Sequence, residues 1–167
     1  MRQQSVGPTD AVLYRLQRGL AGYVSYLAAC EMNKAFSEYV LYEPTLRILT
    51  AQAYTVETER PCPGFPTKAG DKKKIDFVVT GENPNVLFAM EMKWAKRRRI
   101  PKLKDDIEKL QKFREQYQEA ECLLCVFGVM SVLKELNVPD GVTERRDAVY
   151  ADMKRTRYGC RIFKLTA

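Results

Sequence analysis

Apolar side chains recur at intervals of three and four residues along the first part of the chain. This spacing predicts an amphipathic helix that begins near Thr9 and Asp10, which supply N-cap chemistry, and ends near Cys30. Its apolar positions are Leu13, Leu16, Leu20, Val24 and Leu27. A second helix is predicted over residues 35–52, with a kink or break near residues 40–43 because Pro44 has no N–H donor.

Short apolar or alternating runs bounded by glycine and proline predict five strands. The predicted strands are residues 53–60, 72–80, 86–93, 121–130 and 158–165. Residues 121–130 form a nearly continuous apolar run, which is typical of a central strand covered on both faces. Further helices are predicted over residues 101–120, opened by Pro101, and over residues 131–137, whereas the charged segment 142–157 is interpreted as irregular or helical.

The predicted order is helix, helix, three strands, helix, strand, helix, strand. We therefore expect an α/β fold in which a mixed central β-sheet is flanked by helices. The length suits one domain over residues 1–167. Within it, residues 1–34 are expected to form an N-terminal helical extension, residues 35–130 the core, and residues 131–167 a C-terminal helix and strand.

The second and third predicted strands form the segment around which the chemistry gathers. They flank the turn sequence Gly-Glu-Asn-Pro-Asn, and folding the hairpin about the middle of that turn places Asp76 across from Glu91. Because side chains alternate along a strand, Glu91 and Lys93 share one face, and Met92 points to the other. Two carboxylates and an ammonium group thus meet at the end of an apolar sheet, where an unpaired charge is unfavourable. An acidic pair of this kind suits a divalent cation with oxygen ligands.

An acid followed two residues later by lysine occurs three times in the chain. Only Glu91-x-Lys93 closes an apolar strand that follows an acid-bearing strand. Together with Ile75-Asp76, this spacing resembles the motif of the PD-(D/E)-x-K, or restriction-endonuclease-like, nuclease superfamily, with Ile75 in place of the proline. The order of elements over residues 37–124 is also similar to the αβββαβ core of that superfamily, here with an added N-terminal helix.

The resemblance implies a metal-dependent nuclease that hydrolyses phosphodiester bonds, with a DNA endonuclease as the leading expectation. Asp76 and Glu91 would be catalytic and would bind Mg²⁺, for which Mn²⁺ can substitute, with the Met92 backbone carbonyl as an additional metal ligand. Lys93 would orient the attacking water, ease its deprotonation and neutralise charge on the phosphoryl oxygens.

The helix before the sheet often supplies another acid to the metal site in this superfamily. We assign this catalytic and metal-binding role to Glu38, and Glu43, just before Pro44, is the alternative. A solvated glutamate on a helix surface is the other interpretation of either residue.

A net charge of +7 favours a polyanionic partner. The run from Lys96 to Arg99 directly follows the Glu91-x-Lys93 strand, so we expect it to contact the phosphate backbone of nucleic acid. The predicted nucleic-acid-binding residues are Lys74, Trp94, Lys96, Arg97, Arg98 and Arg99. Trp94 would stack on a base or pack under the next helix, and Lys109 and Gln111 are further candidate contacts.

The residue inventory excludes other classes of chemistry. The chain has no histidine, which removes Ser-His-Asp, Cys-His and histidine-metal sites, and its five cysteines do not form a disulfide pattern. Cys122 and Cys125 are interpreted as part of a buried strand. No segment is long and apolar enough to span a membrane and no signal-peptide core is present, so a cytoplasmic protein is expected.

The partner is expected to be nucleic acid, with DNA favoured over RNA, and cleavage of both strands of a duplex would be simplest for a homodimer. The alternative function is a catalytically inactive nuclease-like module that binds nucleic acid or protein. In that case Asp76, Glu91 and Lys93 would form a partly buried ion cluster without metal.

Overall fold

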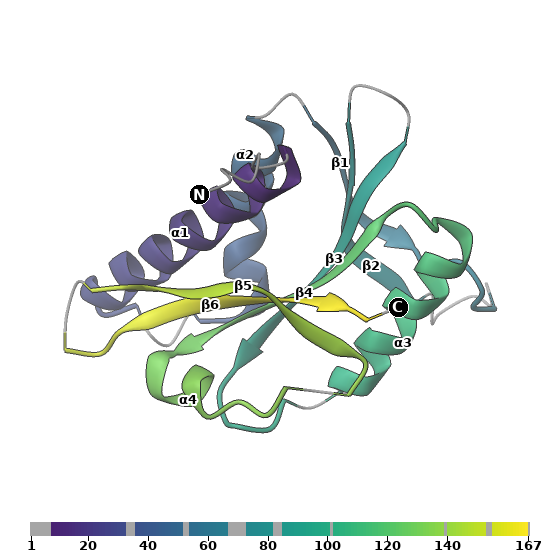
Figure 1. Ribbon diagram of the computed structural model, residues 1–167. Helices are drawn as coiled ribbons and strands as arrows, with labels where there is room; N and C mark the ends of the chain where they lie inside the picture. Colours follow the sequence, from purple (N-terminus) through teal and green to yellow (C-terminus); the bar gives the residue numbers. More distant parts are fainter. Residues whose placement is uncertain are drawn as a thin grey trace, which may run out of the picture.

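The computed structural model describes residues 8–32, 36–51, 54–66, 73–81, 85–100, 102–138, 140–152 and 155–166 (Figure 1). Over these residues the chain forms an α/β fold with a six-stranded mixed sheet and four α-helices. The helices are α1 (Pro8–Ala29), α2 (Tyr42–Thr50), α3 (Leu103–Gln116) and α4 (Met130–Lys134), and the 3₁₀ turn η2 (Glu38–Leu41) precedes α2. The strands are β1 (Thr55–Pro61), β2 (Lys74–Thr80), β3 (Val86–Ala95), β4 (Glu121–Val129), β5 (Val142–Ala151) and β6 (Tyr158–Leu165).

The sheet has the strand order β1-β2-β3-β4-β6-β5. Strands β3 and β4 are parallel, with α3 in the connection between them, and the other neighbouring strands are antiparallel. Strand β4 lies in the interior of the sheet and is buried along nearly all of its length. This confirms the central strand that the apolar run at residues 121–130 predicted.

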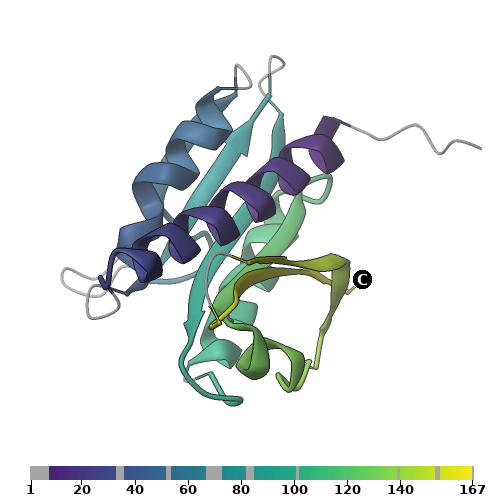
Figure 2. The ribbon, with the colours of Figure 1, turned by 90° about the vertical axis from the view of Figure 1, so that its left-hand side faces the viewer.

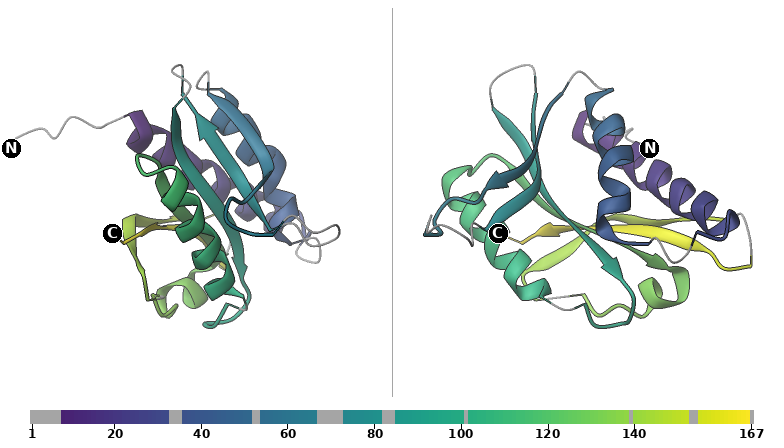
Figure 3. Two further views of the ribbon diagram at one scale, coloured as in Figure 1. Left: turned by 90° about the vertical axis from the view of Figure 1, so that its right-hand side faces the viewer. Right: turned by 180° about the vertical axis from the view of Figure 1, so that it is seen from behind.

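Helices cover both faces of the sheet. Figure 2 shows α1 and α2 lying across one face, and the left view of Figure 3 shows α3 on the opposite face. The first face buries a cluster that includes Phe77 and Phe127 under α1 and α2. The second buries Leu124 and Phe163 under α3 and α4. The expected sheet with helices on both sides is therefore confirmed. No helix in the described part of the chain is long and apolar enough to cross a membrane.

The predicted helices are present with some changes in their bounds. Helix α1 agrees with its predicted bounds, α4 is shorter than the predicted 131–137, and the helix predicted over residues 35–52 is divided into η2 and α2. The division falls at residues 40–43, as expected, and Pro44 lies in the first turn of α2, where an N–H has no helical partner to lose. Helix α3 ends at Gln116, earlier than predicted. Residue 35, Pro101 and the centre of the hairpin turn lie outside the described residues.

The prediction of an irregular or helical segment over residues 142–157 is wrong, because most of it is strand β5. β5 pairs only with β6 at the edge of the sheet, where charged side chains on a strand remain exposed to solvent. Its pairing register shifts between Glu144 and Arg146 and again between Arg146 and Val149. These irregularities break the two-residue alternation by which a strand is found in a sequence.

The close approach of β3 to β4 depends on Gly128. A Cβ atom at this position would lie 2.8 Å from the backbone oxygen of Ala95, its pairing partner on β3. We expect Gly128→Ala to push the two strands apart and to lower the free energy of unfolding by about 1–3 kcal/mol. Urea unfolding followed by circular dichroism measures the change.

The matched control is Gly22→Ala on α1, where an added Cβ meets nothing within 4 Å. Because alanine is the better helix former, this variant should be more stable than the wild type by about 0.5–1 kcal/mol. Equal effects of the two substitutions would contradict the packing described for β3 and β4.

Candidate active site

The site forms where β2 separates from β3. Pairing between them runs as far as Phe77 and Met90, while β3 continues beside β4 to Ala95. Beyond Met90, two carboxylates take the places of strand partners: the Met92 N–H donates to Asp76 Oδ2 at 2.8 Å, and the Trp94 N–H donates to Glu38 Oε1 at 3.3 Å. Backbone donors in such a position need partners, and carboxylates are strong ones.

Asp76 also accepts a hydrogen bond from the opposite side. The Tyr42 hydroxyl, on the first residue of α2, donates to Asp76 Oδ1 at 2.5 Å. Burial and the adjacent Asp76 carboxylate raise the pKa of Tyr42, so the hydroxyl keeps its proton and remains a donor. The Asp76 carboxylate is therefore fixed by one bond to each oxygen.

Glu91 lies next to Asp76 and is fully buried. Its Oε2 accepts from Lys109 Nζ on α3 at 2.6 Å, whereas its Oε1 has no hydrogen-bond partner among the described residues. Burial and the neighbouring Asp76 raise the pKa of the Glu91 carboxyl well above its usual range, and Lys109 opposes that shift. A buried acceptor without a partner is costly, so Glu91 is not placed here for stability.

Lys93 points to the same side of the sheet as Glu91 and keeps 16% of its side chain exposed. Its Nζ lies 3.1 Å from Asp106 Oδ2 and 3.7 Å from Glu38 Oε2. Burial opposes the charged form of Lys93, but the carboxylates of Asp106 and Glu38 outweigh it and raise its pKa. Lys93 is therefore a fixed cation at the mouth of the site.

The charges of this cluster do not cancel. It contains four carboxylates and two ammonium groups, so with all four carboxylates ionised, as a bound cation would hold them, two negative charges have no counterpart inside it. The members are Glu38, Asp76, Glu91, Asp106, Lys93 and Lys109, and we call them the acid cluster. Within the described ranges, no group of three or more acidic or cysteine side chains converges into a ready metal-ligand set. Lysines and Tyr42 contact several of the carboxylate oxygens.

The structure brings together the four side chains predicted to be catalytic. Glu38, Asp76, Glu91 and Lys93 all lie along the last residues of β3. Glu43 lies elsewhere: it is exposed and pairs with Arg47 one turn further along α2. The Met92 side chain is buried on the opposite face, where Thr45 contacts its sulfur at 3.7 Å. The Met92 carbonyl stays a predicted metal ligand.

A groove of about 650 Å³ opens beside Lys93. Its charged residues are Glu38, Lys93, Lys96, Arg97, Arg99 and Lys102. The cations after β3 thus line a hollow that leads to the acid cluster. Within the described residues, Lys96, Arg97, Arg99 and Lys102 have no salt-bridge partner. They are free to bind an anion.

Three other residues predicted to bind nucleic acid have partners within the protein. Arg98 pairs with Glu135, and Lys74 pairs with Glu59 at 2.7 Å. The Trp94 ring packs against Phe36, with ring centroids 5.1 Å apart, and also lines the groove. The ring therefore packs on the face of the sheet opposite α3, so the prediction that it packs under the next helix is wrong.

Sequence reasoning missed Asp106 and Tyr42, and it named Lys109 only as a candidate substrate contact. Asp106 lies on the buried side of α3, in helical register with the apolar residues Leu110 and Phe113. An acid at a position where an apolar side chain is expected was the sequence signal that could have identified it. Tyr42 gave no signal, because its role depends on how α2 crosses β2.

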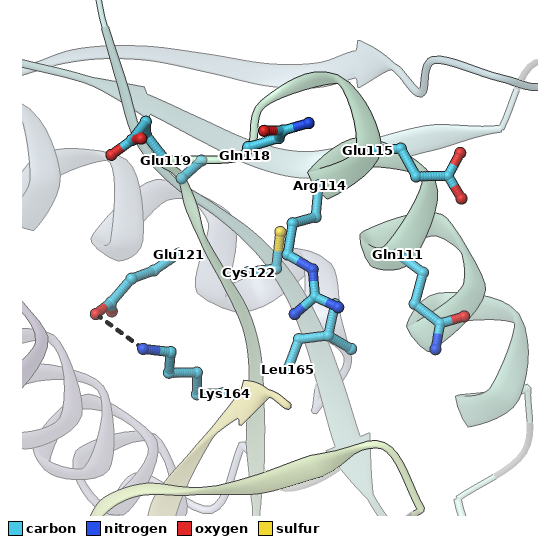
Figure 4. A pocket seen from close by; sticks show the side chains of 10 residues that line it. Gln111, Arg114, Glu115, Gln118, Glu119, Glu121, Cys122, Lys164 and Leu165 are labelled. Carbon is cyan, nitrogen blue, oxygen red and sulfur yellow. Dashed lines mark ion pairs between the residues drawn. The ribbon is translucent and has the colours of Figure 1, made fainter. Parts of the chain in front are cut away.

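A second hollow, of about 700 Å³, is slightly larger but lies away from the acid cluster (Figure 4). It is lined by the end of α3 and by parts of β4 and β6, and includes Gln111 and Glu121. Three of its charged groups have partners: Glu121 lies 3.7 Å from Lys164, and Arg114 donates to the Thr166 carbonyl at 2.6 Å. Gln111, the other candidate contact, is thus separate from the site.

The raised pKa of Glu91 determines how the stability of the protein changes with pH. The folded state holds the Glu91 proton more tightly than the unfolded state, so the resulting stability is present below the usual carboxyl pKa of about 4.5 and is lost as pH rises. We expect Glu91→Gln to raise the free energy of unfolding at neutral pH, with the difference vanishing near pH 4. Urea unfolding across that pH range measures it.

In Glu91→Gln, Lys109 keeps Asp106 and the Lys74 carbonyl as partners, so its ammonium group is not left without an acceptor. Glu108→Gln, an exposed position on the same helix, is the control and should change stability little at any pH. A Glu91→Gln protein that is less stable than the wild type at neutral pH would contradict the assignment.

Comparisons of the chain with protein-family models, with curated proteins and with solved structures found no match.

Proposed function

We propose that this chain is a metal-dependent nuclease of the PD-(D/E)-x-K type that hydrolyses phosphodiester bonds of nucleic acid, with DNA as the favoured substrate. The observation that carries the proposal is the excess of two negative charges in the acid cluster, directly beside a groove lined by cations. A divalent cation would balance the negative charge of the acid cluster, and the phosphate backbone of nucleic acid would bind to the cations of the groove.

The residues of the site fit a hard cation such as Mg²⁺ or Mn²⁺. The unpartnered Oε1 of Glu91 is a buried oxygen without a donor, and Asp76 is fixed beside it. Each Asp76 oxygen has a second lone pair beyond the bond that it accepts. Because Mg²⁺ keeps several waters, two protein carboxylates are enough to hold it. Glu38 and the Met92 carbonyl are the further proposed ligands.

The cation, when bound, would supply an activated water and Lewis-acid stabilisation. The other contributions belong to side chains of this chain. Lys93, protonated and partly exposed, would orient the water and offset charge on the phosphoryl oxygens. The Tyr42 hydroxyl and the Met92 N–H would hold Asp76 in one orientation.

The basic groove would position the substrate. Lys96, Arg97, Arg99 and Lys102 surround the approach to Lys93, so a bound strand would place a phosphate over the acid cluster. Contacts of this kind are made to the backbone and carry little sequence information. The proposal therefore includes binding that weakens steeply with added salt.

The fold supports the same proposal. The elements from η2 through β4 follow the αβββαβ order, with the acids on two adjacent antiparallel strands. The restriction-endonuclease-like core is inferred from this order and from the placement of Asp76, Glu91 and Lys93. A binding module that does not cleave is the other outcome that the experiments below distinguish.

We expect Lys93→Met to lower cleavage of plasmid and oligonucleotide DNA in Mg²⁺ or Mn²⁺ by about 100-fold or more. DNA binding measured by fluorescence anisotropy should change little, because the groove has several other cations. Lys134→Met on α4 removes an exposed lysine away from the site and should cleave like the wild type.

A matched pair of glutamates gives the second control. Glu38→Gln should lose most of the activity, whereas Glu43→Gln should keep it, since Glu43 pairs with Arg47 on the exposed side of α2. A wild-type protein that binds DNA but cuts neither DNA nor RNA with either metal would favour the binding module. Full activity in Lys93→Met would refute the catalytic assignment.

A further inference from the structure

We infer that Asp106 is a positioning residue, which holds the two lysines of the acid cluster in their working places and so keeps Glu38 and Glu91 available to a cation. The inference rests on the proposed function of this site. No sequence motif pointed to Asp106, which comes from α3 and reaches β3 only in the folded chain.

Each oxygen of the Asp106 carboxylate lies next to a different ammonium group. Its Oδ1 lies 3.0 Å from Lys109 Nζ, and its Oδ2 lies 3.1 Å from Lys93 Nζ. Only 5% of the Asp106 side chain is exposed, so water competes little for either oxygen. A desolvated carboxylate between two cations restrains both.

Helix hydrogen bonding and buried neighbours hold the backbone of Asp106 in place. Asp106 begins the hydrogen bonding of α3, its N–H donating to the Lys102 carbonyl at 3.2 Å, and the partial positive charge of a helix N-terminus favours a carboxylate there. Leu110 and Phe113, on the same side of α3, are fully buried against the sheet. Asp106 is thus fixed relative to β3, as a positioning group must be.

Without Asp106, each lysine would have only other members of the site or a backbone oxygen as partners. Lys93 would keep Glu38, now 3.7 Å away, and its flexible stem would let the ammonium group move closer to that acid. Lys109 would keep Glu91 at 2.6 Å and the Lys74 carbonyl at 3.1 Å. Both lysines would then neutralise acids that are proposed to bind the cation. Asp106 draws them away from those acids.

The test is Asp106→Asn, which keeps the shape of the side chain and removes its charge. We expect kcat for DNA cleavage to fall about 10- to 100-fold, as misplaced catalytic groups do, while KM for DNA changes less than about twofold. Affinity for Mg²⁺ measured by calorimetry without DNA should also fall, because Glu38 becomes paired more closely. Asp105→Asn, the exposed neighbour in the same helical turn, should leave all three quantities unchanged.

A purely structural role is separated by two further variants. Ile107→Val removes one methyl group from the buried side of α3 and provides a modest loss of stability, about 0.5–1.5 kcal/mol, without touching the cluster. It should keep wild-type kcat. In the double variant Lys93→Met with Asp106→Asn, the second change should add little to the loss of kcat from the first, because Asp106 acts in good part through Lys93.

Three results would overturn the inference and leave the proposed function standing. They are a wild-type kcat in Asp106→Asn, additive losses of kcat in the double variant, and a loss of kcat in Ile107→Val as large as that in Asp106→Asn. An Asp106→Asn protein that fails to fold would also overturn it, because Asp106 would then be a structural residue. A wild-type protein without cleavage activity overturns the proposed function itself and the inference with it.

Discussion

The structure of this site depends on the exposed backbone edge of β3. After Met90 strand β2 is no longer paired with β3, and the N–H groups of Met92 and Trp94 donate to carboxylates instead. These two donors lie two residues apart on one edge, roughly 7 Å along a strand, which fixes the separation of Asp76 and Glu38 along that edge. Glu38 and Glu91 lie next to Lys93 and Lys109, and the Asp106 carboxylate lies between the two ammonium groups. These contacts reduce the cost of taking polar groups out of water.

The acid cluster and the neighbouring groove carry opposite charge. Inside, the carboxylates outnumber the lysines, and Glu91 is held in a place where burial opposes its charge. Outside, Lys96, Arg97 and Arg99 are exposed and lie in the approach to Lys93. A fold under selection for stability alone would replace such a cluster with apolar side chains of similar volume. A charge arrangement of this kind beside a complementary groove favours a functional site over a purely structural one.

The sequence predicted most of this arrangement where the signal is local. The hairpin turn placed Asp76 next to Glu91, and the register that pairs Phe77 with Met90 agrees with it. The continuous apolar run of β4 and the helical spacing of α1 were equally clear. Asp106 and Tyr42 could not be assigned, because their partners come from elements that meet only through tertiary packing. Strand β5 was missed because irregular pairing and edge charges remove its alternation.

Calorimetric titration of Mg²⁺ or Mn²⁺ into wild-type protein and Asp76→Asn measures whether Asp76 and Glu91 hold a divalent cation, as we propose. We expect saturable binding to the wild type that is lost in the variant, whose fold is checked by circular dichroism. Asp76→Asn removes the carboxylate fixed beside Glu91, and the remaining proposed acid ligand, Glu38, is already engaged by the Trp94 N–H and Lys93. Equal binding to both proteins, or none to the wild type even with DNA present, would contradict the account.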